Sequence, residues 1–466
     1  MSGHTRKRYD VLVVGGGNAG LCATLSALEH FASVLMIESA PKNARGGNTK
    51  YTRDIRYAHD LDDYTTGSYS EEEFTDDVFR VTHNNTNIGL LRKVVSESRT
   101  IPKWLEAHDI IIHEALKGTL HLGRTNLFML GGGKAMVNSY YDAAEREGVE
   151  VCYETRCTNL TITGNRVSGA EITGTDGKDN IEVGSVVVAS GGFEANLDWL
   201  GEYWGNATRN FIVRGSWYNT GEMLKILLGL KARTVGNLRQ FHSVAVDARS
   251  PKYDGGIVTR IDSIPFGITV NKEGERFYDE GEDLWPKRYA IWGKLIAEQP
   301  DQKAYSIIDS RAKELFLPTV FEPETAESIP GLAAKLGIDP DALSKTVDEY
   351  NRSTSENCVF NPGLLDDCGT SGLRLPKSHW ARPIDTSPYY GYPFRPGITF
   401  TYYGAEVNER AQVLSADGSP FSNLFAAGEI MSGNILSEGY LAGFGLTIGT
   451  VFGITAGREA AEIAEK

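Results

Sequence analysis

The sequence predicts an α/β fold in which a Rossmann-like sheet domain is interrupted by a capping domain of α+β type. An apolar strand that runs into a glycine turn occurs within the first forty residues, and the pattern recurs at residues 186–192 and 423–428. The segment from about 237 to about 400 is instead rich in proline, tryptophan, tyrosine and charged residues. We therefore expect residues 1–236 and 401–466 to form one discontinuous domain and residues 237–400 to be inserted into it.

The first forty residues contain a complete strand–turn–helix–strand unit. Tyr9–Val14 is a short run of apolar and β-branched residues, which is typical of a buried strand. The sequence GGGNAG follows and fits the pattern GxGxxG. Residues 21–30 have helical composition, and residues 33–37 are a second apolar strand that ends at Glu38. This order of elements predicts a dinucleotide-binding turn.

Each glycine of this turn has its own mechanical reason. Gly15 permits the turn, Gly17 lets the backbone approach a pyrophosphate at the helix N-terminus, and Gly20 lets the helix pack closely on the sheet. Glu38 is placed to accept hydrogen bonds from a ribose, because it follows the second strand 18 residues beyond Gly20. Its negative charge repels a 2′-phosphate, so NADP is disfavoured.

A second glycine turn, at Arg45–Lys50, comes directly after this acidic residue. A simple NAD-binding domain would continue here into further strand–helix units. A loop that returns to the cofactor suits a longer ligand whose ring system must also be held. The two turns together therefore favour FAD over NAD.

Charge and composition exclude several other classes of protein. Lysine and arginine total 47 and the acidic residues 61, so the formal net charge is −14, which disfavours binding to nucleic acid or to an anionic membrane. No stretch reaches 18 apolar residues and no signal-peptide pattern occurs, so we expect a cytoplasmic protein without an integral membrane segment. The five cysteines form no CxxC and the nine histidines no paired motif, which predicts incidental reduced thiols and no metal site.

Several motifs together resemble the fumarate reductase/succinate dehydrogenase flavoprotein family, and the likeness covers nearly the whole chain. Beside the N-terminal unit, they are Arg45–Lys50, Val186–Asn196, Gly267–Glu280 and Leu424–Gly457. The segment Gly267–Glu280 is close to the capping-domain signature of that family. Within the family, the sequences GGNTKYTR from Gly46 and GYLAG from Gly439 are most similar to the tricarballylate dehydrogenases.

The resemblance implies non-covalent FAD in a domain of the glutathione-reductase type. Some members attach FAD through a histidine in the glycine turn after the acidic residue, but residues 46–49 contain none. The cysteines also lack the spacing of an iron–sulfur cluster or a haem, so a separate electron acceptor or donor is needed. The implied FAD contacts are Gly15, Gly17, Asn18, Ala19, Gly20, Glu38, Ser39, Gly46, Gly47, Asn48, Thr49, Ala189, Ser190, Gly191, Gly428, Glu429, Gly443, Gly445 and Leu446.

The resemblance also implies interconversion of C–C and C=C bonds next to a carboxylate or carbonyl group. Hydride passes between one carbon and flavin N5, while a protein group moves a proton at the neighbouring carbon. Cations that polarise the carboxylate and a positioned acid or base are therefore required. We expect one to three of six arginines to reach the substrate, namely Arg233, Arg239, Arg249, Arg260, Arg276 and Arg288.

The family's substrate residues are only partly retained. His242 and Thr259 match the pattern, whereas Arg260 replaces a glutamate and Ser263 replaces a relay arginine. The main proton-donor arginine has no counterpart, and Arg288, with Tyr289 beside it, is the nearest basic candidate. At the C-terminal end, Thr401 replaces a histidine and Tyr440 an arginine. The predicted catalytic residues are Arg288, Tyr440, Tyr402 and Arg260, and the predicted substrate-binding residues are His242, Thr259, Arg260, Thr401 and Tyr289.

Three functions stay open. The first is a flavin dehydrogenase or reductase of a small polycarboxylate or related acid, like the tricarballylate dehydrogenases. The second acts on a bulkier enone or specialised metabolite, like the 3-ketosteroid dehydrogenases, and is favoured by the 21 tyrosines and 18 phenylalanines. The third is an electron-transfer or assembly subunit. Substrate-facing arginines would favour the first, an apolar lining the second and a large exposed apolar patch the third.

Overall fold

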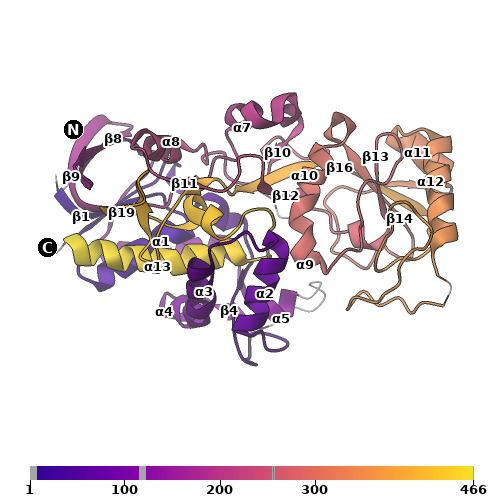
Figure 1. Ribbon diagram of the computed structural model, residues 1–466, viewed down its shortest axis with the longest axis horizontal. Coiled ribbons are helices and arrows are strands. Elements are labelled where there is room, and N and C mark those ends of the chain that lie inside the picture. The colour runs from indigo at the N-terminus through magenta and orange to yellow at the C-terminus, as the bar shows by residue number, and fades with distance from the viewer. Residues whose placement is uncertain (1–7, 115–121, 254–255, 257, 356, 465–466) are drawn as a thin grey trace.

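Two β-sheets at opposite ends of an elongated molecule organise the chain (Figure 1). The predicted α/β class with an added capping domain is confirmed, because a parallel sheet covered by helices at one end is joined to a second, mainly antiparallel sheet at the other. The computed structural model describes residues 8–114, 122–253, 256, 258–355 and 357–464.

The larger sheet brings both ends of the chain into one layer. Its main path is, in order, β18 (Gln412–Leu414), β19 (Pro420–Ala426), β9 (Gly177–Val188), β1 (Arg8–Val14), β2 (Val34–Ile37) and β6 (Glu150–Cys152). The strands from β19 to β6 all pair in parallel, and only β18 is antiparallel to its neighbour. The carboxyl ends of β1, β2, β9 and β19 therefore open at the same edge of the sheet.

The expected antiparallel meander differs in one strand. Residues 149–155, 157–163, 166–173 and 180–183 alternate like strands, with turns at Gly164–Asn165 and Asp176–Gly177, and this pattern predicts a small antiparallel meander. In the structure, β6 instead extends the parallel sheet beside β2. The meander consists of β7 (Arg156–Thr163), β8 (Arg166–Gly174) and the first part of β9. β9 alternates between exposed and buried residues in the meander and is continuously buried from Ser185, so one strand joins the meander to the parallel part of the same sheet.

Two helices from opposite ends of the sequence cover one face of the larger sheet. They are α1 (Asn18–Glu29) and α13 (Phe444–Ala464), and the latter runs along the sheet as the yellow helix of Figure 1. A Cβ atom at Gly453 would lie 2.5 Å from the carbonyl oxygen of Ala19, and one at Gly457 would overlap that of Ala23. The glycines of α13 therefore allow backbone-to-backbone contact between the two helices.

The capping domain is built on one long strand, β16 (Tyr389–Thr401). Its partners are β10 (Ile212–Val213), β12 (Phe241–Asp247), β14 (Ala304–Asp309) and β15 (Glu324–Ala326), and β13 (Ile268–Asn271) pairs with β14. A separate apolar core lies under α11 (Ile329–Leu336) and α12 (Pro340–Ser353). The boundaries at 237 and 400 stay a prediction, since β10 joins this sheet from earlier in the sequence.

The other elements complete the walls around the junction of the two domains. A three-stranded sheet contains β3 (Asp54–Arg56), β5 (Asn126–Met129) and β4 (Ile112–His113), and β11 (Thr234–Val235) pairs with β17 (Gly404–Ala405). The remaining α-helices are α2 (Glu71–Thr82), α3 (Ile88–Glu97), α4 (Ile101–Ala107), α5 (Leu122–Thr125), α6 (Gly132–Arg146), α7 (Leu197–Trp204), α8 (Glu222–Gly229), α9 (Trp285–Arg288) and α10 (Trp292–Ala297).

The cysteines differ from the expectation that all are reduced. Cys358 and Cys368 form a disulfide with their Cα atoms 5.5 Å apart, whereas Cys22, Cys152 and Cys157 are not disulfide-bonded. Pairing depends on the fold that brings two Cα atoms within bonding range, which the spacing of the pair in sequence does not indicate. Over the described part of the chain, no helix is both long enough and apolar enough to span a bilayer.

Substitution of one helical glycine tests the contact between α1 and α13. Gly457→Ala is expected to lower the free energy of unfolding by about 1–3 kcal/mol, because the added methyl group overpacks against Ala23. The matched control is Gly229→Ala at the end of α8, where a Cβ atom has no described neighbour within 4 Å. Thermal unfolding of both variants is the measurement, and an unchanged melting temperature for Gly457→Ala would contradict the packing described.

Candidate active site

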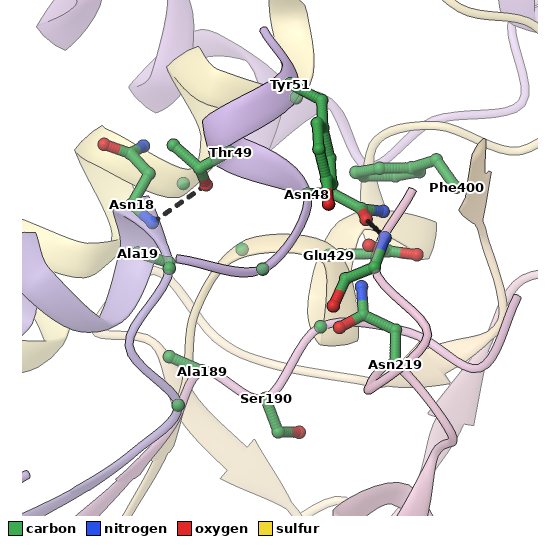
Figure 2. A pocket seen from close by; sticks show the side chains of 18 of the residues that line it. Asn18, Ala19, Asn48, Thr49, Tyr51, Ala189, Ser190, Asn219, Phe400 and Glu429 are labelled. Carbon is green, nitrogen blue, oxygen red and sulfur yellow. Dashed lines mark hydrogen bonds between the residues drawn. The ribbon is translucent and has the colours of Figure 1, made fainter. Parts of the chain in front are cut away.

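A cavity lies where the parallel strands end and the capping domain begins, and glycine turns from distant parts of the sequence meet in it (Figure 2). It is lined by residues after β1, after β2, after β9 and after β19, and by the start of α13. This edge is where open α/β sheets bind ligands. Of the predicted FAD contacts, all line the cavity except Gly20, which packs in α1 against Gly15, and Gly46, which packs against Val137.

The two N-terminal glycine turns pack against each other at the start of α1. Gly15 has a φ of +108°, which favours glycine, and a Cβ atom there would overlap the carbonyl oxygen of Ala189. The backbone N–H of Asn18 donates to Thr49 Oγ1 at 3.0 Å, as Figure 2 shows by a dashed line. The first turn of α1 contains no acidic residue, so its free N–H groups and dipole suit a pyrophosphate.

Glu38 is held at the same edge by backbone donors. Its Oε2 accepts from the N–H of Gly16 at 3.1 Å and its Oε1 from the N–H of Ala40 at 2.8 Å. Burial raises the pKa of the Glu38 carboxyl, whereas these hydrogen bonds lower it. The carboxylate lines the cavity with lone pairs to spare, as an acceptor of ribose hydroxyls requires.

The second glycine turn connects the cavity to the capping strand. Asn48 donates to Glu194 Oε1 at 2.7 Å and to the carbonyl oxygen of Thr399 at 2.8 Å, and its Oδ1 accepts from the N–H of Ser216 at 2.6 Å. The side chain is therefore fully bonded and fixes the turn against β16. The glycine turns, the helix N-terminus and the bonded acidic residue together fit FAD.

Two buried carboxyls lie beside this turn. Glu194 Oε1 also accepts from Asn219 at 2.6 Å, and Glu429 Oε1 accepts from the N–H of Thr401 at 2.8 Å. Burial raises the pKa of both groups, and for Glu429 the adjacent Glu194 raises it further. Glu194 Oε2 has no hydrogen-bond partner among the described residues.

Aromatic side chains and one arginine form the wall of the cavity on the side of the capping domain. The His242 ring stacks on Tyr440 with centroids 4.2 Å apart and meets Tyr289 edge-on at 5.4 Å. The Arg260 guanidinium lies over the Tyr289 ring, 4.7 Å from its centroid. All four side chains line the cavity, so the structure brings Arg260, His242, Tyr289 and Tyr440 together.

His242 is a neutral imidazole in this wall. Burial lowers its pKa well below its ordinary value, and the cations Arg214 and Arg260 lower it further. Neither ring nitrogen has a hydrogen-bond partner among the described residues, although both are buried. A neutral ring offers one donor and one acceptor, and here both are available to a ligand.

The other predicted substrate residues lie outside the lining. Arg288 forms an ion pair with Glu282 at 2.8 Å, and the Tyr402 ring is fully buried. The Thr259 hydroxyl donates to the carbonyl oxygen of Gly256, and Thr401 binds Glu429. Of the six arginines singled out in the sequence, Arg260 alone lines the cavity; four others form ion pairs elsewhere, namely Arg233, Arg249, Arg276 and Arg288.

Arg214 and Arg53 line the cavity but were missed by the sequence analysis. Arg214 follows β10, is 8% exposed and donates from Nη1 to Thr399 Oγ1 at 3.3 Å. Arg53 pairs with Asp54 at 3.3 Å. The arginines predicted from the sequence all lie between positions 233 and 288. No local pattern marks Arg214, because its place in the cavity depends on the pairing of β10 with β16.

The FAD binding domain family matches residues 10–440 of the chain. The chain belongs to the fumarate reductase/succinate dehydrogenase flavoprotein family. It is 28% identical to an NADH:fumarate oxidoreductase of Klebsiella pneumoniae, over 98% of this chain, and spans 48% of that protein's length. It is 25% identical to a vinyl phenol reductase of Lactiplantibacillus plantarum, over 97% of this chain and 96% of that protein.

A solved structure shares the fold of the flavoprotein. The 3-ketosteroid Δ4-(5α)-dehydrogenase of Rhodococcus jostii, in complex with 4-androstene-3,17-dione, superimposes with a TM-score of 0.76 over 98% of each chain. The two sequences are 21% identical, so this likeness is one of fold. It supports the assignment of an FAD-binding domain with a capping domain.

The raised pKa values of the two buried carboxyls, Glu194 and Glu429, predict a pH-dependent stability. Their folded pKa values lie above the ordinary 4.5, so the wild-type free energy of unfolding falls as the pH rises above about 4.5. Glu194→Gln, a neutral isostere, is expected to flatten this dependence. The measurement is the melting temperature at pH 5 and pH 8, with Glu72→Gln on the exposed side of α2 as control. An equal fall in wild type and Glu194→Gln would contradict a raised pKa of Glu194.

Proposed function

We propose that the flavoprotein is an FAD-dependent oxidoreductase that forms or reduces a C–C double bond next to a carboxylate of a small polyacid, of the tricarballylate type. The observation that carries the proposal is the pair of buried guanidiniums, Arg214 and Arg260, in the cavity beside neutral His242. The names of the relatives agree, because fumarate and vinyl phenol both contain the C=C bond that such an enzyme reduces.

The charges of the cavity favour a carboxylate over a neutral ligand. Arg214 and Arg260 both lie close enough to His242 to lower its pKa. A guanidinium in a site of low dielectric binds a carboxylate through charge-assisted hydrogen bonds, which are about twice as strong as neutral ones. The N–H of His242 adds a third donor without adding charge. Polarisation of a carboxylate by these groups makes the neighbouring C–H bond more acidic or the C=C bond more electrophilic.

Tyr289 is the group that we propose moves the proton. Burial raises the pKa of Tyr289 to about 12, and the guanidinium of Arg260 on its ring opposes that rise. Tyr440 is the second candidate, and its hydroxyl oxygen already accepts from the N–H of Gly445 at 2.9 Å. FAD, when bound, supplies the hydride acceptor or donor. Arg288 and Tyr402 were also predicted as catalytic residues, and their places outside the lining favour Tyr289 over both.

A bulkier enone is the second candidate substrate. The stacked rings of His242 and Tyr440, with Phe400 at 5.7 Å from Tyr440, form an aromatic wall that suits an alicyclic or aromatic compound. The solved ketosteroid dehydrogenase shares the fold. The cations that line the cavity favour the polyacid, since a guanidinium forms charge-assisted hydrogen bonds with a carboxylate that an uncharged ligand cannot offer. An electron-transfer subunit without substrate chemistry would need the glycine turns that hold FAD, but not Arg214, Arg260 and His242 at the other side of the cavity.

The cofactor and electron partner complete the proposal. We propose non-covalent FAD, because residues 46–49 contain no histidine, and a separate electron carrier as acceptor or donor. The cytoplasmic location and the oligomeric state stay outside the proposal.

Acid precipitation of the yellow holoprotein is expected to release all flavin into the supernatant, read by absorbance. Colour that remains in the protein pellet would overturn non-covalent attachment.

Removal of either cavity cation is expected to weaken the use of a carboxylate. Arg214→Met and Arg260→Met should each lower kcat/KM for tricarballylate by roughly 10- to 100-fold, the loss of a hydrogen bond to a charged group. Stopped-flow reduction of the flavin is the measurement. The matched control, Arg249→Met, removes a capping-domain arginine that pairs with Asp247 outside the cavity, and should leave the rate unchanged. Reduction of the flavin by a saturated ketone, or reoxidation of the reduced flavin by an enone, without reaction of any carboxylate would refute the polyacid and favour the second candidate.

Removal of the Tyr289 hydroxyl tests whether Tyr289 transfers the proton. Tyr289→Phe is expected to lower kcat by about 10²- to 10⁴-fold, the usual contribution of general acid–base catalysis, with a smaller change in KM. Tyr440→Phe is the comparison and should lose less. The measurement is steady-state turnover with the best substrate of the panel. A kcat for Tyr289→Phe within threefold of wild type would exclude Tyr289 as the proton-transfer group.

A further inference from the structure

We infer that Asp262 and Trp285 are positioning residues that fix the orientation of the Arg260 guanidinium over Tyr289. The inference rests on the proposed function, in which Arg260 binds the substrate carboxylate. It goes beyond that function in assigning two residues that do not line the cavity. These residues act on the reaction through the Arg260 guanidinium that they hold in place.

The Asp262 carboxylate is held at both oxygens. Its Oδ2 accepts from Nη2 of Arg260 at 2.7 Å, and its Oδ1 accepts from the indole Nε1 of Trp285 at 2.7 Å. Asp262 is 7% exposed and Trp285 6% exposed, so water does not compete for either bond. A carboxylate fixed at both oxygens cannot rotate, and the guanidinium bonded to it is fixed in turn.

The opposite constraint on Arg260 comes from Tyr289. The guanidinium lies over the ring, 4.7 Å from its centroid, so its plane is set by the aromatic face and its direction by Asp262. The buried Nε has no hydrogen-bond partner among the described residues. Two sides of the guanidinium are therefore occupied by protein, and an N–H group is left for a ligand in the cavity.

Trp285 connects the pair formed by Arg260 and Asp262 to a segment of the capping domain that ion pairs hold in place. Trp285 begins α9 and Tyr289 follows the helix directly, with the two rings 6.4 Å apart. The segment is fastened to α2 by two ion pairs, Arg80 with Asp283 at 2.7 Å and Lys287 with Asp77. The indole N–H thus sets the position of Asp262 from the same segment that carries Tyr289. Movement of that segment would shift the cation and the proton-transfer hydroxyl together.

The charge of Asp262 separates positioning from binding. Its removal frees the orientation of Arg260 but leaves the guanidinium in the cavity and makes its surroundings more positive. A substrate anion is then bound no more weakly, although it is no longer held in the reactive geometry. Positioning therefore predicts a loss in the rate of the chemical step with little change in affinity, opposite to the effect of deleting the cation itself.

The experiment uses the holoenzyme and tricarballylate as the probe, with Kd from the change in flavin absorbance and the rate of flavin reduction at saturation. Asp262→Asn is expected to reduce the rate at least tenfold while Kd changes less than threefold. Trp285→Phe, which keeps the ring and loses the N–H, should reduce the rate about threefold to tenfold. Arg260→Met should instead raise Kd. A wild-type rate in Asp262→Asn, or a change in its Kd alone, overturns the inference.

The matched control is Asp309→Asn at the end of β14. Asp309 is 2% exposed and also pairs with an arginine two residues away, Arg311, but neither lines the cavity. It is expected to lower the melting temperature without changing the rate, which separates a structural effect from positioning. Failure of the proposed function shows in the wild type, as no flavin reduction with any carboxylate. The variants are then measured with the enone that reacts, and an unchanged rate in Asp262→Asn again overturns the inference.

Discussion

The parallel pairing of β9 with β1 and of β19 with β9 is the constraint on which the site depends. It aligns the carboxyl ends of strands from both ends of the chain, so their glycine turns open at one edge. A helix N-terminus, an acidic residue and a second glycine turn are then brought to the same cavity. The close contact of α1 with α13 fixes this arrangement from the other side, because a side chain at Gly457 would separate the helices.

The electrostatics of the cavity follow from burial. Buried charges need partners, and the cations here are compensated in pairs, Arg260 by Asp262 and Arg53 by Asp54. Burial acts against charge on the other groups: it lowers the pKa of His242 beside two guanidiniums, and it raises the pKa values of Glu194 and Glu429. The result is a site whose positive groups are held in fixed directions, as stabilisation of a developing negative charge requires.

The sequence predicted the features that local patterns determine. The turn at Gly15–Gly20, the acidic residue Glu38 and the strand before Gly428 each follow from a few adjacent residues, and they lie at the cavity. Features that depend on tertiary pairing were not predictable. Whether β6 joins the meander or the main sheet depends on its neighbour β2, and Arg288 is drawn away from the cavity by Glu282. Arg214 and the Cys358–Cys368 bond likewise depend on which distant segments meet.

The central claim is that FAD and a carboxylate substrate share one cavity, with the carboxylate held by Arg214 and Arg260. A crystal structure of the holoprotein with citrate, an unreactive polycarboxylate, tests it most directly. The account predicts FAD along the glycine turns and a citrate carboxylate within hydrogen-bonding distance of both guanidiniums. Citrate bound elsewhere, or a cavity in which Arg214 and Arg260 turn away from the flavin, would contradict it.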